Sequence, residues 1–193
     1  MSQVGNGLYA SRHYEDALSV QEAELSLRRR LGVSEESILA VQANIAMSYE
    51  RLGRVEEALC VKRDVYSGRL KLSGKSHEDT LRAANNYAAS LLDMERLEEA
   101  KSLLRKTIPV VRRVLGEGHR LTLKMRRIYA AALCEDPAAT LDDLREAVTM
   151  LVETARTTQR VMGGTHPLTA GIEENLRDAR AALRARETPP RSA

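Results

Sequence analysis

The chain has 193 residues and a formal net charge of +3, from 30 Lys and Arg against 27 Asp and Glu. This near balance does not by itself indicate a nucleic-acid-binding protein, and only 3% of the residues are aromatic, which leaves few rings on which single-stranded bases could stack. The 43% of hydrophobic residues is enough for one ordinary domain or one short array of repeats.

Apolar residues recur every three or four positions along the chain, which predicts helices, and no segment alternates as a strand would. One such stripe runs from Ile38 through Val41 and Ile45 to Tyr49. We expect about nine helices, in chain order at residues 3–11, 14–31, 35–52, 55–72, 77–94, 97–115, 120–135, 140–162 and 166–187.

The helical pattern is also repeated. The segment that begins at Asn44, NIAMSYERLGRVEEAL, aligns with NYAASLLDMERLEEAK from Asn86, at an offset of 42 residues. A third copy follows at the same offset and then gains extra residues around Asp136 and Pro137. A period in this range predicts a stack of helical hairpins, an all-α solenoid.

The repeat divides the chain into units of two helices. We expect a single repeat domain over residues 1–187, followed by a disordered tail at 188–193. Within that domain the predicted units are a degenerate hairpin at about 3–31, hairpins at 35–72, 77–115 and 120–162, and a capping helix at 166–187.

A second motif, Gly-x-x-His-x-x-Thr, recurs in SGKSHEDTL, LGEGHRLTL and MGGTHPLTA and places His77, His119 and His166 in equivalent positions. Neighbouring packed helices are roughly 8–10 Å apart, whereas imidazoles that share a zinc ion each lie about 2 Å from it. The histidines are therefore predicted to be structural and to bind no metal. We expect the glycines to end helices, and Ser76 and Thr165 to cap the helices that follow.

The remaining sequence offers little catalytic chemistry. It contains no GxGxxG, GxxxxGK[ST], HExxH or GxSxG motif, so we expect neither an enzyme nor a cofactor. Cys60 and Cys134 form no CxxC pair, which favours a reducing compartment. No signal peptide or membrane-spanning stretch is visible, and the predicted location is therefore cytoplasmic.

The segments LGRVEEA, ERLEEA, LGEGHRLT and MGGTHPLT together resemble the tetratricopeptide repeat, in the long form found in kinesin light chains. The resemblance spans roughly residues 12–183. It departs from the family pattern at Glu95, where the family prefers glycine, in the degenerate first unit and in the insertion of the third. It implies a right-handed superhelix of hairpins that acts as a binding module, with the first helix of each hairpin lining a concave groove.

Carried onto this chain, the resemblance implies a groove that is rich in amides and cations. Asparagines there can hydrogen-bond an extended peptide backbone, and the cations can pair with its carboxylates. Asn86 and Lys124 match part of the family's clamp for chaperone tails, but Ala43 and Met47 stand where the clamp needs lysine and asparagine. The implied groove residues are Asn44, Arg82, Asn85, Asn86, Lys124, Arg127 and Asn175.

Two functions from different classes remain open. The first is an adaptor or scaffold whose groove holds an extended, acidic peptide of a protein partner, with no role for nucleic acid or membrane. The alternative is an architectural spacer within a larger assembly, with no peptide ligand and with a merely solvated polar face. We expect a monomer or weak self-association in either case.

Overall fold

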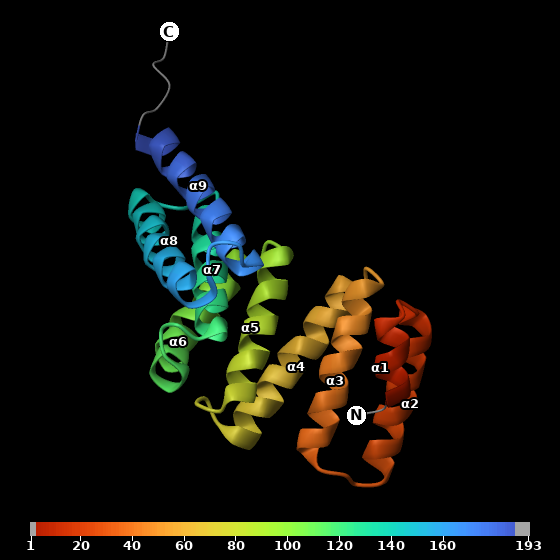
Figure 1. The fold of residues 1–193 in the computed structure, drawn as a ribbon. Helices are drawn as coiled ribbons and strands as arrows, with labels where there is room; N and C mark the ends of the chain where they lie inside the picture. Colours follow the sequence, from red (N-terminus) through yellow and green to blue (C-terminus); the bar gives the residue numbers. More distant parts are fainter. Residues whose placement is uncertain (1–2, 188–193) are drawn as a thin grey trace. The chain divides into compact units, whose positions relative to one another are not determined.

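The computed structural model describes residues 3–187, and the predicted tail at 188–193 lies outside them. The described residues form nine α-helices and no strand (Figure 1). Each predicted helix is present, and its ends agree with the prediction to within one residue. The helices are α1 (Gln3–Ala10), α2 (Tyr14–Arg30), α3 (Glu35–Arg51), α4 (Val55–Ser73), α5 (Glu78–Asp93), α6 (Leu97–Leu115), α7 (Arg120–Cys134), α8 (Leu141–Met162) and α9 (Pro167–Glu187).

The chain divides into two compact units, Met1–Ser90 and Leu91–Ala193, and the division falls inside α5. In the first unit, α1 packs on α2, α2 on α3 and α3 on α4. In the second unit, α6 packs on α7 and α7 on α8, while α9 covers both α7 and α8. Within each unit, helices that are consecutive in the chain therefore lie against one another, as the repeat pattern predicts.

Small side chains at equivalent repeat positions are fully buried in the core. Ala58, Ala100 and Ala147 each stand near the start of the second helix of a hairpin, and none of them is exposed to solvent. In the first unit, a Cβ placed on Gly68 of α4 would lie 2.5 Å from a methyl group of Leu39 on α3. These helices approach closely because small residues stand where they touch.

The Gly-x-x-His-x-x-Thr motif is a helix-to-helix turn. Each glycine has a positive φ of 77–88° and ends a helix, as predicted. Each histidine is the residue immediately before the next helix, and its Nδ1 accepts a hydrogen bond from the backbone N–H two residues later, at 3.0–3.2 Å. Nδ1 can accept because the proton of a neutral imidazole is then on Nε2.

These histidines, rather than the residues before them, cap the helices. The carbonyl of His77 accepts the first helical hydrogen bond, from Leu81, so the prediction of Ser76 as the cap was wrong by one residue, and Thr165 likewise gives way to His166. Imidazole can do this because Nδ1 is as many bonds from the backbone as the side-chain oxygen of asparagine, a preferred N-cap.

The threonine completes the turn in two of the three copies. The hydroxyls of Thr122 and Thr169 donate to the carbonyls of Gly116 and Gly163 at 2.8 Å, which satisfies a carbonyl at the end of the preceding helix. Thr80 donates instead to the carbonyl of Arg69, at 3.1 Å. Hydrogen bonds between these side chains and the backbone thus account for the histidine in all three copies and for the threonine in two of them.

The insertion of the third repeat is held from two sides. Lys101 of α6, which is 5% exposed, forms an ion pair of 2.5 Å with Asp136 in the inserted segment. The guanidinium of Arg186, near the end of α9, donates to the carbonyls of Pro137 and Ala139 at 3.1 and 2.9 Å. Extra residues are tolerated here because their polar groups find partners on both neighbouring helices.

Candidate functional site

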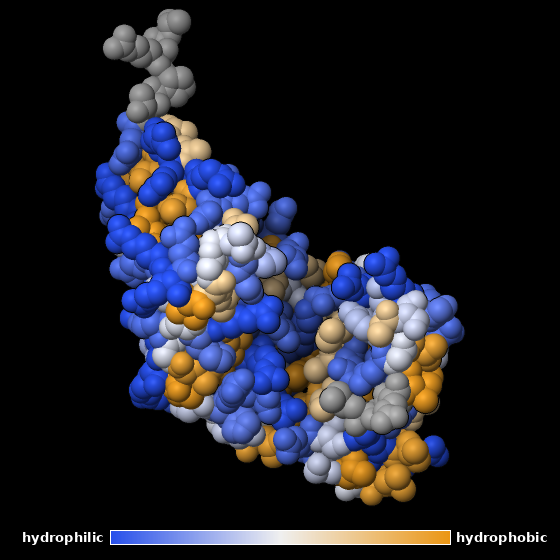
Figure 2. Space-filling view, in the orientation of Figure 1, coloured by the Kyte–Doolittle hydropathy of each residue, from blue (hydrophilic) through white to orange (hydrophobic). Residues whose placement is uncertain are grey.

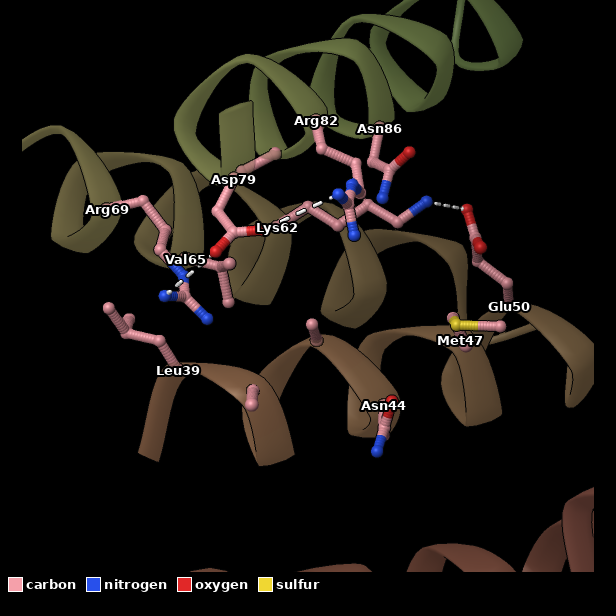
Figure 3. A pocket seen from close by; sticks show the side chains of 13 residues that line it. Leu39, Asn44, Met47, Glu50, Lys62, Val65, Arg69, Asp79, Arg82 and Asn86 are labelled. Atoms are coloured by element: carbon pink, nitrogen blue, oxygen red, sulfur yellow. Dashed lines mark hydrogen bonds and ion pairs between the residues drawn. The ribbon is translucent and has the colours of Figure 1, made fainter. Parts of the chain in front are cut away.

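A pocket of about 520 Å³ opens in the first unit, between α3, α4 and the N-terminal half of α5 (Figure 3). Its floor is apolar, with buried Leu39 on α3, Val65 on α4 and Ala83 on α5. Small side chains on α3, Ala40 and Ala43, leave the volume unfilled. A pocket of this volume, with an apolar floor and polar groups at its edge, is typical of sites that accept a side chain of a ligand.

The apolar surface reaches solvent at the rim through Met47, which is 44% exposed. Methionine is flexible and polarizable, so it adapts to ligands of different shape. On the face drawn in Figure 2, apolar surface occurs as separate patches among hydrophilic residues. Exposed apolar surface at a pocket is more informative than the same surface elsewhere, because single exposed apolar residues are normal.

Charged side chains form the rest of the rim, and each cation already has an acidic partner. Lys62 pairs with Glu50 and donates to the hydroxyl of Ser90 at 2.8 Å. Arg69, which is 9% exposed, lies 3.7 Å from the carboxylate of Asp79. Figure 3 draws both pairs as dashed lines between the side chains that line the pocket. The lining residues together carry three cations and two carboxylates, so the pocket has a small positive excess.

Arg82 is the most accessible of these cations. Its guanidinium lies 2.8 Å from Glu78 and 3.6 Å from Asp79, which stand four and three residues earlier on the same helix. Exposed pairs of this kind contribute only about 0.3–0.5 kcal/mol. A carboxylate of a ligand can therefore replace either partner at little cost.

A second pocket of about 130 Å³ adjoins the first and shares Asn44 and Met47 with it. Its other lining residues are Asn6 and Tyr9 of α1 and Gln21 of α2. The Nδ2 of Asn44 donates to the Oδ1 of Asn6 across 3.5 Å. The two pockets together form a polar-edged groove along the exposed face of α3, within the first unit.

The structure brings three of the predicted groove residues together. Asn44, Arg82 and Asn86 all line the 520 Å³ pocket. Asn85 does not line it: this residue is 7% exposed, its Nδ2 donates to the Oδ1 of Asn86 at 3.3 Å, and its own Oδ1 has no hydrogen-bond partner. Adjacent residues differ by about 100° around a helix, so Asn85 and Asn86 cannot both face the groove.

The other predicted residues belong to the second unit. Lys124 and Arg127 are half-buried on α7, and Asn175 on α9 lines a separate pocket of about 180 Å³ with Cys134 and Asp178. The grouping of these three residues with those of the first unit stays a prediction.

Sequence reasoning missed the contribution of α4 to the pocket. Lys62 and Arg69 are spaced seven residues apart, two helical turns, and so lie on one side of α4. That spacing was visible, but the resemblance directs attention to the first helix of each hairpin, whereas α4 is a second helix. Their acidic partners, Glu50 and Asp79, come from other helices and follow from packing alone.

Of the two cysteines, Cys134 is partly buried and Cys60 is exposed. Burial, with a smaller contribution from Glu135 and Asp178, raises the pKa of the Cys134 thiol to about 11, so it is not a thiolate at neutral pH. Between residues 3 and 187, no three His, Cys, Asp or Glu side chains are grouped so that they could hold a metal ion. None of the described helices combines the length and the apolarity that a membrane crossing requires.

One segment of the chain matches the model of a known family. Residues 80–121 match the model of the tetratricopeptide repeat. No curated protein sequence matches the chain.

Solved structures agree in fold. One is a crystal structure of a variant of kinesin-light-chain TPR-like repeats from Podosopora anserina, repeats that are nearly identical to one another. The sequence of that protein is 20% identical to this chain, and the TM-score is 0.79 over 96% of this chain and 85% of that one. A second structure of those repeats gives 20% identity and a TM-score of 0.71, over 98% and 95% of the two chains. BtubC (BKLC) from P. vanneervenii is 14% identical, with a TM-score of 0.71 over 98% and 82%.

Proposed function

We propose that the chain is a repeat protein of the kinesin-light-chain type, an adaptor that holds an extended, acidic peptide of a protein partner. The match of residues 80–121 to the tetratricopeptide repeat and the fold shared with kinesin-light-chain repeats support this proposal. Such repeats generally mediate protein–protein interaction and are generally not catalytic. The observation that carries the proposal is the 520 Å³ pocket, which is lined by Asn44, Arg82 and Asn86 together. Their amides and guanidinium suit the backbone and the carboxylates of a peptide, respectively.

The pocket supports a ligand with both apolar and acidic character. An apolar side chain that fills the floor over Leu39 and Val65 gains about 25 cal/mol for each Å² removed from water. A neighbouring carboxylate can pair with Arg82, which adds roughly 0.2–1 kcal/mol because this arginine is exposed. Most of the affinity would then come from the floor, and the cation would select acidic sequences.

The test is a peptide array in which every member has either acidic or serine residues at fixed positions. The amount of the full chain that each peptide retains is measured. Acidic peptides should be retained more strongly, and retention should fall as salt rises, because exposed charges are screened over about 8 Å at physiological ionic strength. Arg82→Gln should weaken binding by up to about fivefold. The matched control is Lys71→Gln, which replaces an exposed lysine of α4 that lines neither the 520 Å³ nor the 130 Å³ pocket, and it should leave binding unchanged.

The same array tests whether the second unit takes part. Lys124→Glu should leave the chain folded, since this lysine is half-buried rather than in the core. Weaker retention of the acidic peptides by this variant would assign the second unit a share in binding, and unchanged retention would confine the peptide to the first unit. Equal retention of acidic and serine peptides by the unmodified chain would refute the proposal.

One observation favours the alternative, an architectural spacer without a peptide ligand. The cations that line the pocket already have acidic partners: Lys62 pairs with Glu50, Arg69 with Asp79, and Arg82 with Glu78. A face that neutralises its own charges can be a solvated surface. An array that retains no peptide at low salt would support the spacer and exclude the adaptor.

A further inference from the structure

Helix α7 carries three cations on one face, Arg120, Lys124 and Arg127. Residues spaced four and then three apart on a helix are neighbours. Arg120 is exposed, while Lys124 and Arg127 are half-buried. Among the residues that the structure describes, no carboxylate pairs with any of the three. By contrast, Arg126 on the same helix is paired with Glu117 and Glu153, at 3.1 and 2.6 Å.

The cluster is electrostatically uncompensated. Burial, then the charges of Arg120 and Arg127, lower the pKa of Lys124 below its ordinary value. The first turn of α7 contains no acidic residue, so the partial positive charge of the helix N-terminus adds to that of the cluster. A bound anion would relieve this repulsion, and more so because two of the cations are partly withdrawn from water.

The position of Arg127 depends on a glycine in α9. A Cβ placed on Gly171 of α9 would lie 2.7 Å from the Nη1 of Arg127, which is too close for any other residue without a shift of the guanidinium. Glycine inside a helix is destabilising relative to alanine. Its presence here makes room for Arg127 against α9, so the packing holds one cation of the cluster in place.

We propose that Arg120, Lys124 and Arg127 form the binding site for a phosphate group on a serine or threonine side chain of the partner peptide. This proposal rests on the proposed adaptor function and adds that the bound peptide is phosphorylated. A phosphate monoester has a charge of about −1.5 to −2 and three acceptor oxygens, against one charge and two oxygens for a carboxylate. Three adjacent cations match the phosphate better, and arginine binds it through two parallel hydrogen bonds.

The experiment compares three peptide libraries that are identical except at one fixed position, which holds phosphoserine, glutamate or serine. Binding of each to the full chain is measured by fluorescence polarisation at physiological salt. The phosphoserine library should bind about tenfold more tightly than the glutamate library, a factor that corresponds to about 1.4 kcal/mol. The glutamate library should in turn bind more tightly than the serine library.

Variants assign the preference to the site. Lys124→Gln and Arg127→Gln should each reduce the phosphoserine preference, and the double variant should abolish it. Arg156→Gln, which removes an exposed arginine of α8, is the matched control and should keep it. Gly171→Ala should weaken phosphoserine binding while the thermal midpoint stays equal or rises, because alanine favours the helix and only the flexible end of Arg127 must move.

Each other result has a definite meaning. Equal binding of phosphoserine and glutamate would overturn this inference but leave the adaptor function, whereas equal binding of glutamate and serine would overturn the adaptor function. A phosphoserine preference that survives the double variant would place the phosphate elsewhere and overturn the site. Displacement of the phosphoserine library by oligo(dT) at equal phosphate concentration would assign the cluster to nucleic-acid backbone and overturn the peptide inference.

Discussion

Glu95 stands at a backbone position that favours glycine, and replacing it should stabilise the protein. Its φ is +57°, in the left-handed region. Gly53, 42 residues earlier in the repeat, has a φ of +74°. Both end a first helix with the same two hydrogen bonds: Gly53 N–H donates to Glu50 and Arg54 N–H to Tyr49, while Glu95 and Arg96 donate to Leu92 and Leu91. The turns are therefore equivalent, and only the residue type differs.

The magnitude follows from two opposing effects. The left-handed conformation costs a residue with a Cβ about 1–2 kcal/mol. Glycine in turn has more conformational freedom in the unfolded chain, which offsets about 0.4–1 kcal/mol of the gain. Glu95→Gly should thus raise the free energy of unfolding by about 1 kcal/mol, or the thermal midpoint by about 2–4 °C.

The effect of the Glu95 charge on stability has to be separated from that of backbone strain, because this charge also acts on the nearby carboxyl group of Glu135. Burial, followed by the charges of Asp93 and Glu95, raises the pKa of Glu135. Glu95→Gln removes the charge and keeps the Cβ, so it is the matched control. Urea unfolding followed by circular dichroism measures all variants. If Glu95→Gln stabilises as much as Glu95→Gly, or if Gly53→Ala costs nothing, the backbone explanation is wrong.

Two further predictions concern the turns and the insertion. His119→Ala should lower the free energy of unfolding by about 1 kcal/mol, whereas His119→Asn, which keeps an acceptor at the same place, should cost only a few tenths; equal losses in urea titrations would refute the capping role. Lys101 and the backbone N–H of Ala138 hold the pKa of Asp136 below its ordinary value. Its contribution to stability is therefore present at neutral pH and lost as the pH falls through the lowered pKa. Asp136→Asn should cost about 1–3 kcal/mol at pH 7, and this gap should close below about pH 4; a gap independent of pH would show that the ion pair is not its source.

The repeat architecture was readable from the sequence because its causes are local. Apolar periodicity, glycines that permit a positive φ and a fixed offset of 42 residues each act over a few turns of helix, so they located the helices to within one residue. The motif around His119 was recognised for the same reason. In the copies around His77 and His166 the cap was misplaced by one residue because imidazole is not among the usual N-cap side chains, although its Nδ1 has the reach of one.

Only part of the candidate site was encoded in local patterns of the sequence. The separation of Asn85 from Asn86 could have been foreseen, since neighbouring residues diverge by about 100° around a helix. The pairing of Arg82 with Glu78 was also visible, as an i, i+4 spacing. The sequence did not reveal the pairing of Lys62 with Glu50, nor the room that Gly171 leaves for Arg127. These contacts join residues on different helices, and only packing decides which side chains meet there.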